Sequence, residues 1–201
     1  MAKLLGRLKP ETCIFLLCDV QERFRPVAHK FDAVISRSNR MLAAANELKI
    51  PTLVTEQYPK GLGKTVAGVD VSDLAVHGGG VYEKVSFSML CPDVLSQLAA
   101  LGDRTDFILC GIEAHVCVQQ TTLDLLEAGK SVHLCVDAIS SGSPTDRASG
   151  LLRVERAGAF LTTTEAVMMD LIRSKDHPSF KIISNALKAS KLGPEEALEW
   201  V

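Results

Sequence analysis

Short apolar runs alternate with helical patterns along most of the chain. Runs of strand length lie at 13–18, 52–56, 81–85, 106–110, 131–136 and 159–163. Apolar residues recur at the three- and four-residue spacing of amphipathic helices over 27–48, 92–100, 114–128, 145–157, 165–173 and 179–189. Strands that are apolar on both faces and alternate with helices are typical of a parallel sheet covered on two sides. The pattern therefore predicts a three-layer α-β-α fold of the α/β class.

The order of these elements predicts one domain rather than two. A length of 201 residues suits a single large α/β domain, which we place at residues 1–190. The remaining residues, 191–201, read as a polar C-terminal tail. Residues 56–80 form the longest irregular stretch, and we expect a functional loop or a contact between subunits there. Residues 1–11 carry basic residues and leucines, a composition that also occurs in short organelle import signals.

Composition narrows the classes of partner. Hydrophobic residues make up 47% of the chain and charged residues 23%, which is enough apolar material for a sizeable core. The formal net charge is −2 and no basic stripe is visible, which argues against nucleic acid and against an anionic membrane surface as partners. No apolar run approaches the ~20 residues that cross a bilayer. The six cysteines show no CxxC spacing, so we expect reduced thiols and a cytoplasmic protein.

Polar residues stand at the ends of several predicted strands. In open parallel sheets, ligands bind beyond the carboxyl ends of the strands, so these residues are the first candidates for a site. Asp19 ends the first strand and reads either as a general base or as a cap for the next helix. Lys84, at the third strand, would balance a buried carboxylate or extend to solvent. Asp137, after the fifth strand, favours a capping role.

Cys117 differs from the other cysteines in its position. The helical pattern around it begins near Ala114 and stops at Gly129, which puts Cys117 in the first turn of a helix. The free N–H groups and positive dipole end of that turn stabilise a nucleophilic thiolate. The alternative is a small buried hydrophobic side chain. We assign that alternative to the four cysteines within strands, which are Cys13, Cys18, Cys110 and Cys135.

Five segments together resemble the isochorismatase-like cysteine hydrolase superfamily, in its branch of isochorismatase domain-containing proteins. They read LCDVQERF, TEQYPKGLG, EKVSFSML, GIEAHVCVQQTTLDLL and VDAISSGSPTDR, in that order. The resemblance runs from about residue 12 to residue 188. It implies a Rossmann-like six-stranded parallel sheet in the order 3-2-1-4-5-6. Strands one and four are neighbours in that order, so Asp19 and Cys117 would face each other.

The resemblance also implies roles for these residues. Cys117 would be the nucleophile, Asp19 its proton acceptor and Lys84 their electrostatic partner. A cis peptide bond between Ile112 and Glu113 would shape an oxyanion hole, with the N–H groups of Glu113 and Cys117 as donors. The resemblance further implies a homo-oligomer in which loops such as 56–80 lie between subunits.

One motif of the family is missing here. Nicotinamidase relatives carry a metal-binding Asp-x-His motif in the loop after the second strand, but here that loop reads EQYPKGLG. The nearest histidine is His77, so we predict no metal and no other cofactor. His115 is two residues from Cys117, and residues so spaced on a helix point to different faces. A Cys–His dyad is therefore not expected.

These observations predict a metal-independent hydrolase that acts on a small amide-like molecule through a cysteine thioester. The expected pocket wall consists of Gln21, Phe24, Gln57, Tyr58 and Phe87. One alternative is hydrolysis of an enol ether with Asp19 as general acid. Another is a family member that binds a partner without turnover, and a nuclease is the least favoured reading.

Overall fold

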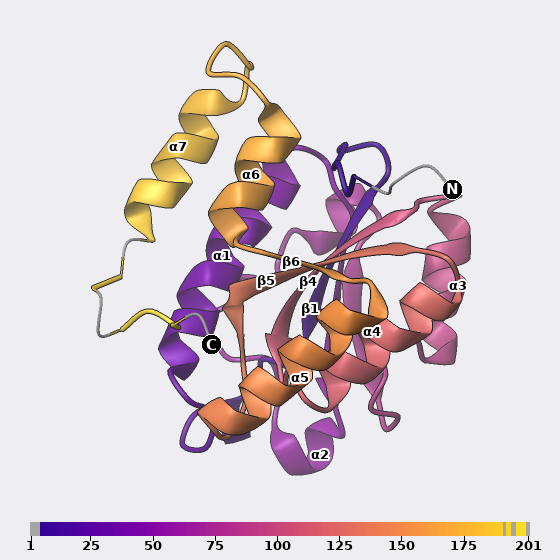
Figure 1. Ribbon diagram of the computed structural model, residues 1–201. Coiled ribbons are helices and arrows are strands. Elements are labelled where there is room, and N and C mark those ends of the chain that lie inside the picture. The colour runs from indigo at the N-terminus through magenta and orange to yellow at the C-terminus, as the bar shows by residue number, and fades with distance from the viewer. Residues whose placement is uncertain (1–4, 191, 194–195, 200–201) are drawn as a thin grey trace.

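The computed structural model describes residues 5–190, 192–193 and 196–199, and its centre is one parallel sheet (Figure 1). The strands are β1 (Cys13–Cys18), β2 (Thr52–Gln57), β3 (Gly80–Lys84), β4 (Asp106–Ile112), β5 (Ser131–Ser140) and β6 (Phe160–Thr162). Their order is β3-β2-β1-β4-β5-β6, and every neighbouring pair is parallel. The predicted sheet and strand order are confirmed.

Helices cover both faces of the sheet (Figure 1). They are α1 (Phe31–Glu47), α2 (Pro59–Leu62), α3 (Pro92–Ala100), α4 (Cys117–Glu127), α5 (Pro144–Ala157), α6 (Thr164–Ile172) and α7 (Phe180–Ala189), with 3₁₀ turns η1 (Glu22–Phe24) and η2 (Leu74–His77). Helices α1, α6 and α7 lie on one side, and α3, α4 and α5 lie on the other. The three-layer prediction is therefore confirmed.

Alternating residues of β1 supply both halves of the core. Phe15 and Leu17 pack on the side of α1, whereas Leu16 and Cys18 pack on the side of α4. All four are fully buried, and each large apolar side chain so buried stabilises the fold by roughly 1.5–3 kcal/mol. Because β1 is apolar on both faces, it occupies the middle of the sheet, and its carboxyl end is enclosed by protein on both sides.

Several boundaries differ from the predicted ones. Helix α1 begins at Phe31 rather than at residue 27, because Lys30 adopts a left-handed conformation with φ 47°. Helix α4 begins at Cys117, after a non-helical turn over residues 114–116. Strand β5 continues to Ser140, since it follows β4 past an irregularity in their register. Residues 56–80 were expected to be irregular, but they hold α2 and η2 as well as the end of β2.

Asp137 lies within β5 and caps a different helix from the one expected. Its carboxylate accepts hydrogen bonds from Thr164 N, at 2.8 Å, and Thr164 Oγ1, at 2.6 Å, at the start of α6. Arg40 Nη2 lies 2.6 Å from the same carboxylate. The helix that follows β5 in sequence is capped instead by Ser143, whose side chain accepts from Asp146 N. Because Asp137 and Thr164 are 27 positions apart, this capping contact cannot be predicted from the local sequence.

Gly111 lets β4 lie close against the carboxyl end of β1. It pairs with Cys18 in the parallel register and has φ +119°. A Cβ atom added at this position would be 2.1 Å from the carbonyl oxygen of Cys18, so only glycine fits. This close approach brings the segment after β4, which leads to Cys117, beside the end of β1.

The ends of the chain are described in part. Residues 1–4 of the candidate import segment, and residues 191, 194–195 and 200–201 of the predicted tail, lie outside the described residues. Within the tail, the carbonyl oxygen of Ala197 accepts a hydrogen bond from Lys30 Nζ at 2.7 Å, and Leu198 packs on the core. Among the helices that the structure describes, none has the length and apolar character needed to cross a membrane.

Buried thiols make the fold sensitive to alkaline pH. Burial raises the pKa of Cys13 from 9.0 to about 12, and it also raises the pKa values of Cys18 and Cys110 well above 9.0. In the unfolded chain these thiols lose their protons near pH 9, whereas in the folded chain they keep them. The folded state therefore binds more protons above pH 9, and its stability falls as the pH rises through this window.

We expect Cys13→Ala to remove one of these contributions. A thiol that ionises only in the unfolded chain lowers the free energy of unfolding by about 1.4 kcal/mol for each pH unit. Urea unfolding between about pH 8 and pH 11 should therefore show a shallower decline for Cys13→Ala than for the wild type above pH 9. Equal slopes for the two proteins would contradict the prediction.

Candidate active site

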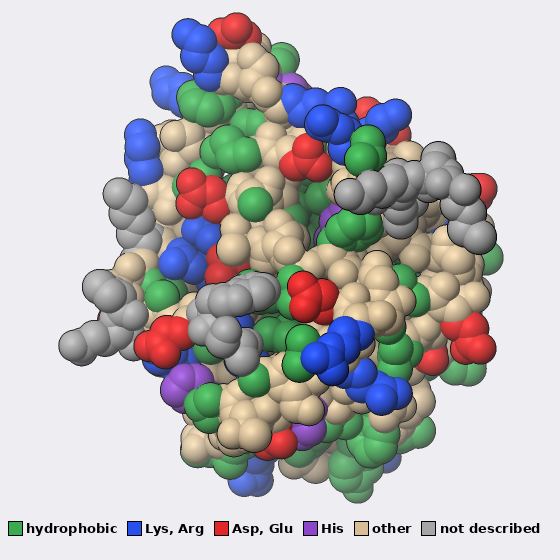
Figure 2. Space-filling model, in the orientation of Figure 1, with side chains coloured by type: hydrophobic (Ala, Val, Ile, Leu, Met, Phe, Trp, Pro, Cys, Tyr) green, Lys and Arg blue, Asp and Glu red, His purple; other side chains and the backbone are tan. Residues whose placement is uncertain are grey.

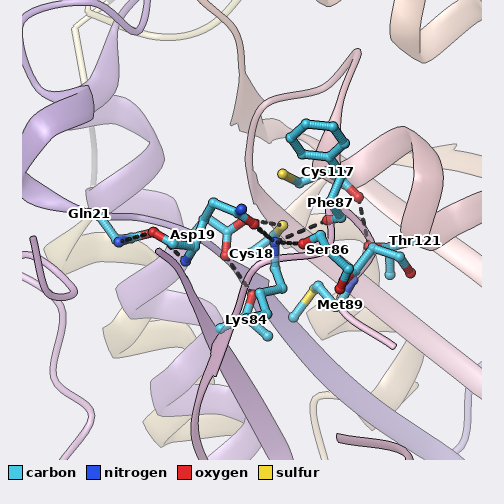
Figure 3. Close-up of polar contacts among 12 residues, drawn as sticks. Cys18, Asp19, Gln21, Lys84, Ser86, Phe87, Met89, Cys117 and Thr121 are labelled. Carbon is cyan, nitrogen blue, oxygen red and sulfur yellow. Dashed lines mark hydrogen bonds and ion pairs between the residues drawn. The ribbon is translucent and has the colours of Figure 1, made fainter. Parts of the chain in front are cut away.

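Residues from β1, β3 and the start of α4 meet at the carboxyl edge of the sheet (Figure 3). Strands β1 and β4 are neighbours in the middle of the sheet, and the chain leaves them toward opposite edges. Ligands of open α/β sheets bind at such a point. Here the structure brings together Asp19, Lys84 and Cys117, as the sequence predicted.

Asp19 is a fully buried carboxylate whose two oxygens both have partners. Oδ1 accepts a hydrogen bond from Thr55 Oγ1 at 2.7 Å, and Oδ2 lies 2.7 Å from Lys84 Nζ. The residue adopts a left-handed conformation, with φ 52°, directly after the last strand residue. That turn directs the carboxylate back over the end of the sheet. The alternative of a helix cap is wrong for Asp19, because its side chain contacts strands.

Lys84 ends β3 and has a completely buried side chain. Besides Asp19, its ammonium group donates to Gln57 Oε1 at 2.6 Å and to the carbonyl oxygens of Ser86, at 3.2 Å, and Phe87, at 3.0 Å. Burial alone would lower the pKa of Lys84, but the acidic groups around it, Cys18 and Asp19 first, outweigh burial and raise that pKa. Lys84 is therefore a fixed positive charge, and the alternative of a solvent-directed lysine is wrong.

Cys117 is the first residue of α4 and is 7% exposed. Its Sγ lies within 4.8 Å of Asp19 and of Cys18. Thr121, one turn later, donates to the carbonyl oxygen of Cys117 at 2.6 Å and accepts from Met89 N at 2.9 Å. Thr121 thereby ties the segment that carries Phe87 to the helix that carries Cys117.

The turn before Cys117 has the expected cis peptide bond between Ile112 and Glu113. Within the described residues, the N–H groups of Glu113 and Cys117 have no hydrogen-bond acceptor. The carbonyl oxygen of Glu113 accepts from Val116 N at 3.1 Å and from Val118 N at 3.2 Å. Two N–H groups near the thiol are therefore free to donate to a ligand.

Cys18 is a neighbour of the site that sequence reasoning assigned to the core. It is fully buried, and its Sγ donates to Asp19 Oδ2 at 3.5 Å. Burial raises the pKa of Cys18, and the neighbouring Cys117 thiol and the charge of Asp19 add to that rise. Consecutive strand residues point to opposite faces, so contact between Cys18 and Asp19 could not be predicted from their positions in the sequence. The left-handed conformation of Asp19 brings them together.

Cys18, Asp19 and Cys117 also have ligand atoms close enough to reach one metal ion, since all lie within 4.8 Å of one another. Two sulfurs and a carboxylate would suit a thiophilic ion such as Zn²⁺. However, the ammonium group of Lys84 already bonds Asp19 Oδ2 at 2.7 Å. A resident cation would have to lie beside that positive charge or displace it, so the residues present fit a metal poorly.

The five residues expected to form the pocket wall occupy different environments. Gln21 is fully buried. Its Nε2 donates to the carbonyl oxygen of Gln57 at 3.0 Å and to that of Gly63 at 2.6 Å. Its Oε1 accepts from Gln57 N at 2.7 Å. Gln21 therefore fastens the segment after β2 to the segment after β1. Phe24 is half-buried against the core on the α1 side. Tyr58 and Phe87 are exposed by 55% and 52%, and both follow strands that end at the site.

His115 faces away from the thiol toward the segment after β5. Its Nδ1 lies 3.1 Å from Ser141 Oγ, as expected for a residue that is not paired with Cys117. A separate cavity of about 330 Å³ lies between α1 and η2 and includes Thr52, the first residue of β2, in its wall. Because Thr52 begins its strand, that cavity lies toward the amino edge of the sheet, away from Asp19 and Cys117.

Comparison with known proteins gives consistent matches. Residues 13–166 match the model of the isochorismatase domain. The chain is 46% identical over 183 residues to isochorismatase domain-containing protein 2 of Danio rerio, covering 91% of this chain and 90% of that one. It is 45% identical over 195 residues to isochorismatase domain-containing protein 1 of Salmo salar, covering 97% and 67%. Among solved structures, the MAR1 ribonuclease from Caenorhabditis elegans superposes with a TM-score of 0.84 at 41% identity, covering 97% and 100%.

Proposed function

This chain belongs to the isochorismatase family, and from that premise we propose that it is a hydrolase with Cys117 as its nucleophile. One observation carries the proposal: a buried, ion-paired Asp19 lies within 4.8 Å of a thiol at the first turn of a helix. A carboxylate beside a thiol can accept its proton, and the helix end stabilises the thiolate that results. We propose a small amide-like molecule as the substrate and no metal in the reaction.

The proposed reaction proceeds through a thioester. A rotation of the Cys117 side chain brings its sulfur to Asp19, which accepts the proton, and the thiolate attacks the substrate carbonyl. The N–H groups of Glu113 and Cys117 stabilise the oxyanion, and the proton moves to the leaving amine as the C–N bond breaks. Asp19 then takes a proton from water, and the water oxygen attacks the thioester carbon. The C–S bond breaks, the acid product leaves, and Asp19 returns the proton to the Cys117 sulfur. Lys84 holds the Asp19 carboxylate in position through their ion pair at 2.7 Å.

Two further substrate classes remain candidates. In enol-ether hydrolysis Asp19 would act as a general acid, and the thiol would not form a bond to the substrate. RNA is a candidate because a relative with 41% identity is described as a ribonuclease. The formal net charge of −2, and the small separate clusters of basic and acidic side chains on the face in Figure 2, favour a small molecule over a polyanion. A screen for activity should include all three classes.

We also propose that the protein is a homo-oligomer. Tyr58 and Val76, both in the segment between β2 and β3, are exposed by 55% and 68% although they are apolar. Contact with a second copy of the chain would remove these apolar surfaces from water. Tyr58 follows β2 at the carboxyl edge of the sheet, whereas Val76, in η2, lies toward the amino edge, so the contact would involve both ends of this connection.

Thiol reactivity tests the proposed nucleophile without a known substrate. At pH 7 we expect iodoacetamide to alkylate Cys117 about tenfold or more faster than Cys91, measured by mass spectrometry of peptides over time. Cys91 is a matched control, because it stands at the start of α3 and is 8% exposed, close to the 7% of Cys117. Among the residues that the structure describes, no Asp–Lys ion pair lies beside it in the sequence. Equal rates would show that exposure alone controls labelling, and the proposed nucleophile would be wrong.

A further inference from the structure

We propose that Cys18 and Cys117 form a reversible disulfide when the site meets a peroxide, so that this site is also one of oxidative modification. The observation behind it is a second buried thiol, Cys18, placed between the Asp19–Lys84 pair and Cys117 (Figure 3). The inference rests on the reactive thiol that the proposed function assigns to Cys117. It goes beyond that function because Cys18 forms no bond to the substrate in hydrolysis.

The two sulfurs are close enough to join after a small movement. They lie within 4.8 Å of each other, and a disulfide bond is about 2.05 Å long. A change of χ1 rotamer moves a cysteine sulfur by roughly 3 Å, which covers the difference. The movement would fall on Cys117, which is at the first position of its helix, rather than on Cys18, which is enclosed within the sheet.

Differences in exposure and hydrogen bonding give the two thiols different roles in disulfide formation. Cys117 is 7% exposed and Cys18 is completely buried, so a peroxide reaches Cys117 first. Cys18 is protonated, and its S–H already donates to Asp19 Oδ2 at 3.5 Å. Asp19 therefore stands ready to take the proton of the second thiol when that thiol is needed as a nucleophile. The arrangement supplies an attacking thiol, a resolving thiol and a base.

The chemistry needs hydrogen peroxide as the oxidant. The Cys117 thiolate attacks one peroxide oxygen, an S–O bond forms, the O–O bond breaks, and the departing hydroxide gains a proton to become water. Cys18 then gives its proton to Asp19 and attacks the sulfur of Cys117. The S–S bond forms as the S–O bond breaks, and the second hydroxide leaves as water with that proton. Two electrons pass from the thiol pair to the peroxide, and a thiol reductant returns them.

A second pair of cysteines in the same chain provides a matched comparison. Cys110 and Cys135 are also neighbours, since Cys135 adds to the burial that raises the pKa of Cys110, but both are fully buried in the core. Among the described residues, neither has a hydrogen bond to a carboxylate. This pair has proximity without access and without a base, so it should stay reduced under the same conditions. The comparison separates the site from the general tendency of neighbouring thiols to oxidise.

The test is peroxide treatment at pH 7 followed by intact-mass and peptide analysis. Wild type should lose about 2 Da, yield a linked peptide containing Cys18 and Cys117, and recover its mass and its fast alkylation with dithiothreitol. Cys18→Ala and Cys18→Ser should instead gain about 16 Da per added oxygen, proceed to the sulfinic acid, and fail to recover with the reductant. Cys135→Ala should behave as wild type does.

Each outcome bears on a different claim. If wild type alkylates rapidly at Cys117 but peroxide gives only sulfinic acid there, the disulfide inference is wrong and the proposed nucleophile stands. A linked peptide that joins Cys110 to Cys135 would likewise overturn the inference. If Cys117 neither alkylates nor oxidises, the proposed function and this inference are both wrong. The wild-type masses decide these cases even where a Cys18 variant folds poorly.

Discussion

Replacing Cys117 by serine should reduce turnover of an amide substrate by about 10⁴-fold or more while the protein still binds its ligand. Serine keeps the size and shape of the side chain, but Asp19 can hardly deprotonate a hydroxyl group, so no nucleophile forms. Steady-state rates on a substrate found among small amides, enol ethers and short RNAs would measure the loss. Cys91→Ser, the same change at a similarly buried helix start, should leave the rate unchanged.

The comparison with Asp19→Asn identifies the chemistry. In the thioester route asparagine removes the base but leaves the thiol, so the rate should fall by about 10²–10⁴-fold, less than for Cys117→Ser. In enol-ether hydrolysis the ranking is reversed, because the reaction needs the acid and not the thiol. Cys117→Ser would then keep most of the activity, which would contradict the thioester route. If neither change affects the measured rate, that activity does not come from this site.

Lys84→Met should cost about 3–5 kcal/mol of the free energy of unfolding, because it leaves the Asp19 carboxylate buried without its counter-charge. The side chains of Lys84 and Asp19 are 0% and 1% exposed, and water cannot replace the lost ammonium group. Methionine fits the same space, so the loss reflects charge rather than a cavity. Urea unfolding at pH 7 gives the difference from the wild type.

A second lysine of the chain is the control for this change. Lys130 Nζ lies 3.3 Å from Asp103 Oδ1, and the Asp103 side chain is 90% exposed. Water screens that pair, so Lys130→Met should change stability far less than Lys84→Met. Adding Asp19→Asn to Lys84→Met should restore part of the lost stability, since the unpaired charge is then gone. Equal losses for the two lysines would show that burial does not strengthen the ion pair.

The sequence by itself determined the succession of strands and helices and the three residues at the centre of the site. Apolar runs such as residues 13–18 have no polar face to expose, so they form buried strands whatever surrounds them. Asp19 and Cys117 were recognisable because each interrupts a local pattern, one at a strand end and one at a helix start. Their pairing came from the resemblance to a family, which the family match and the strand order support.

Only the tertiary structure decided what surrounds those residues. The φ of Asp19 turns its carboxylate onto Cys18, against the alternation expected in a strand. Asp137 caps α6, whose first residue lies 27 positions away. Gln21 donates hydrogen bonds to backbone groups 36 and 42 positions away in the sequence, so its burial cannot be predicted from the residues next to it. These contacts join segments that are distant in sequence, and their geometry depends on how closely the strands approach, as at Gly111, where β4 meets the carbonyl oxygen of Cys18.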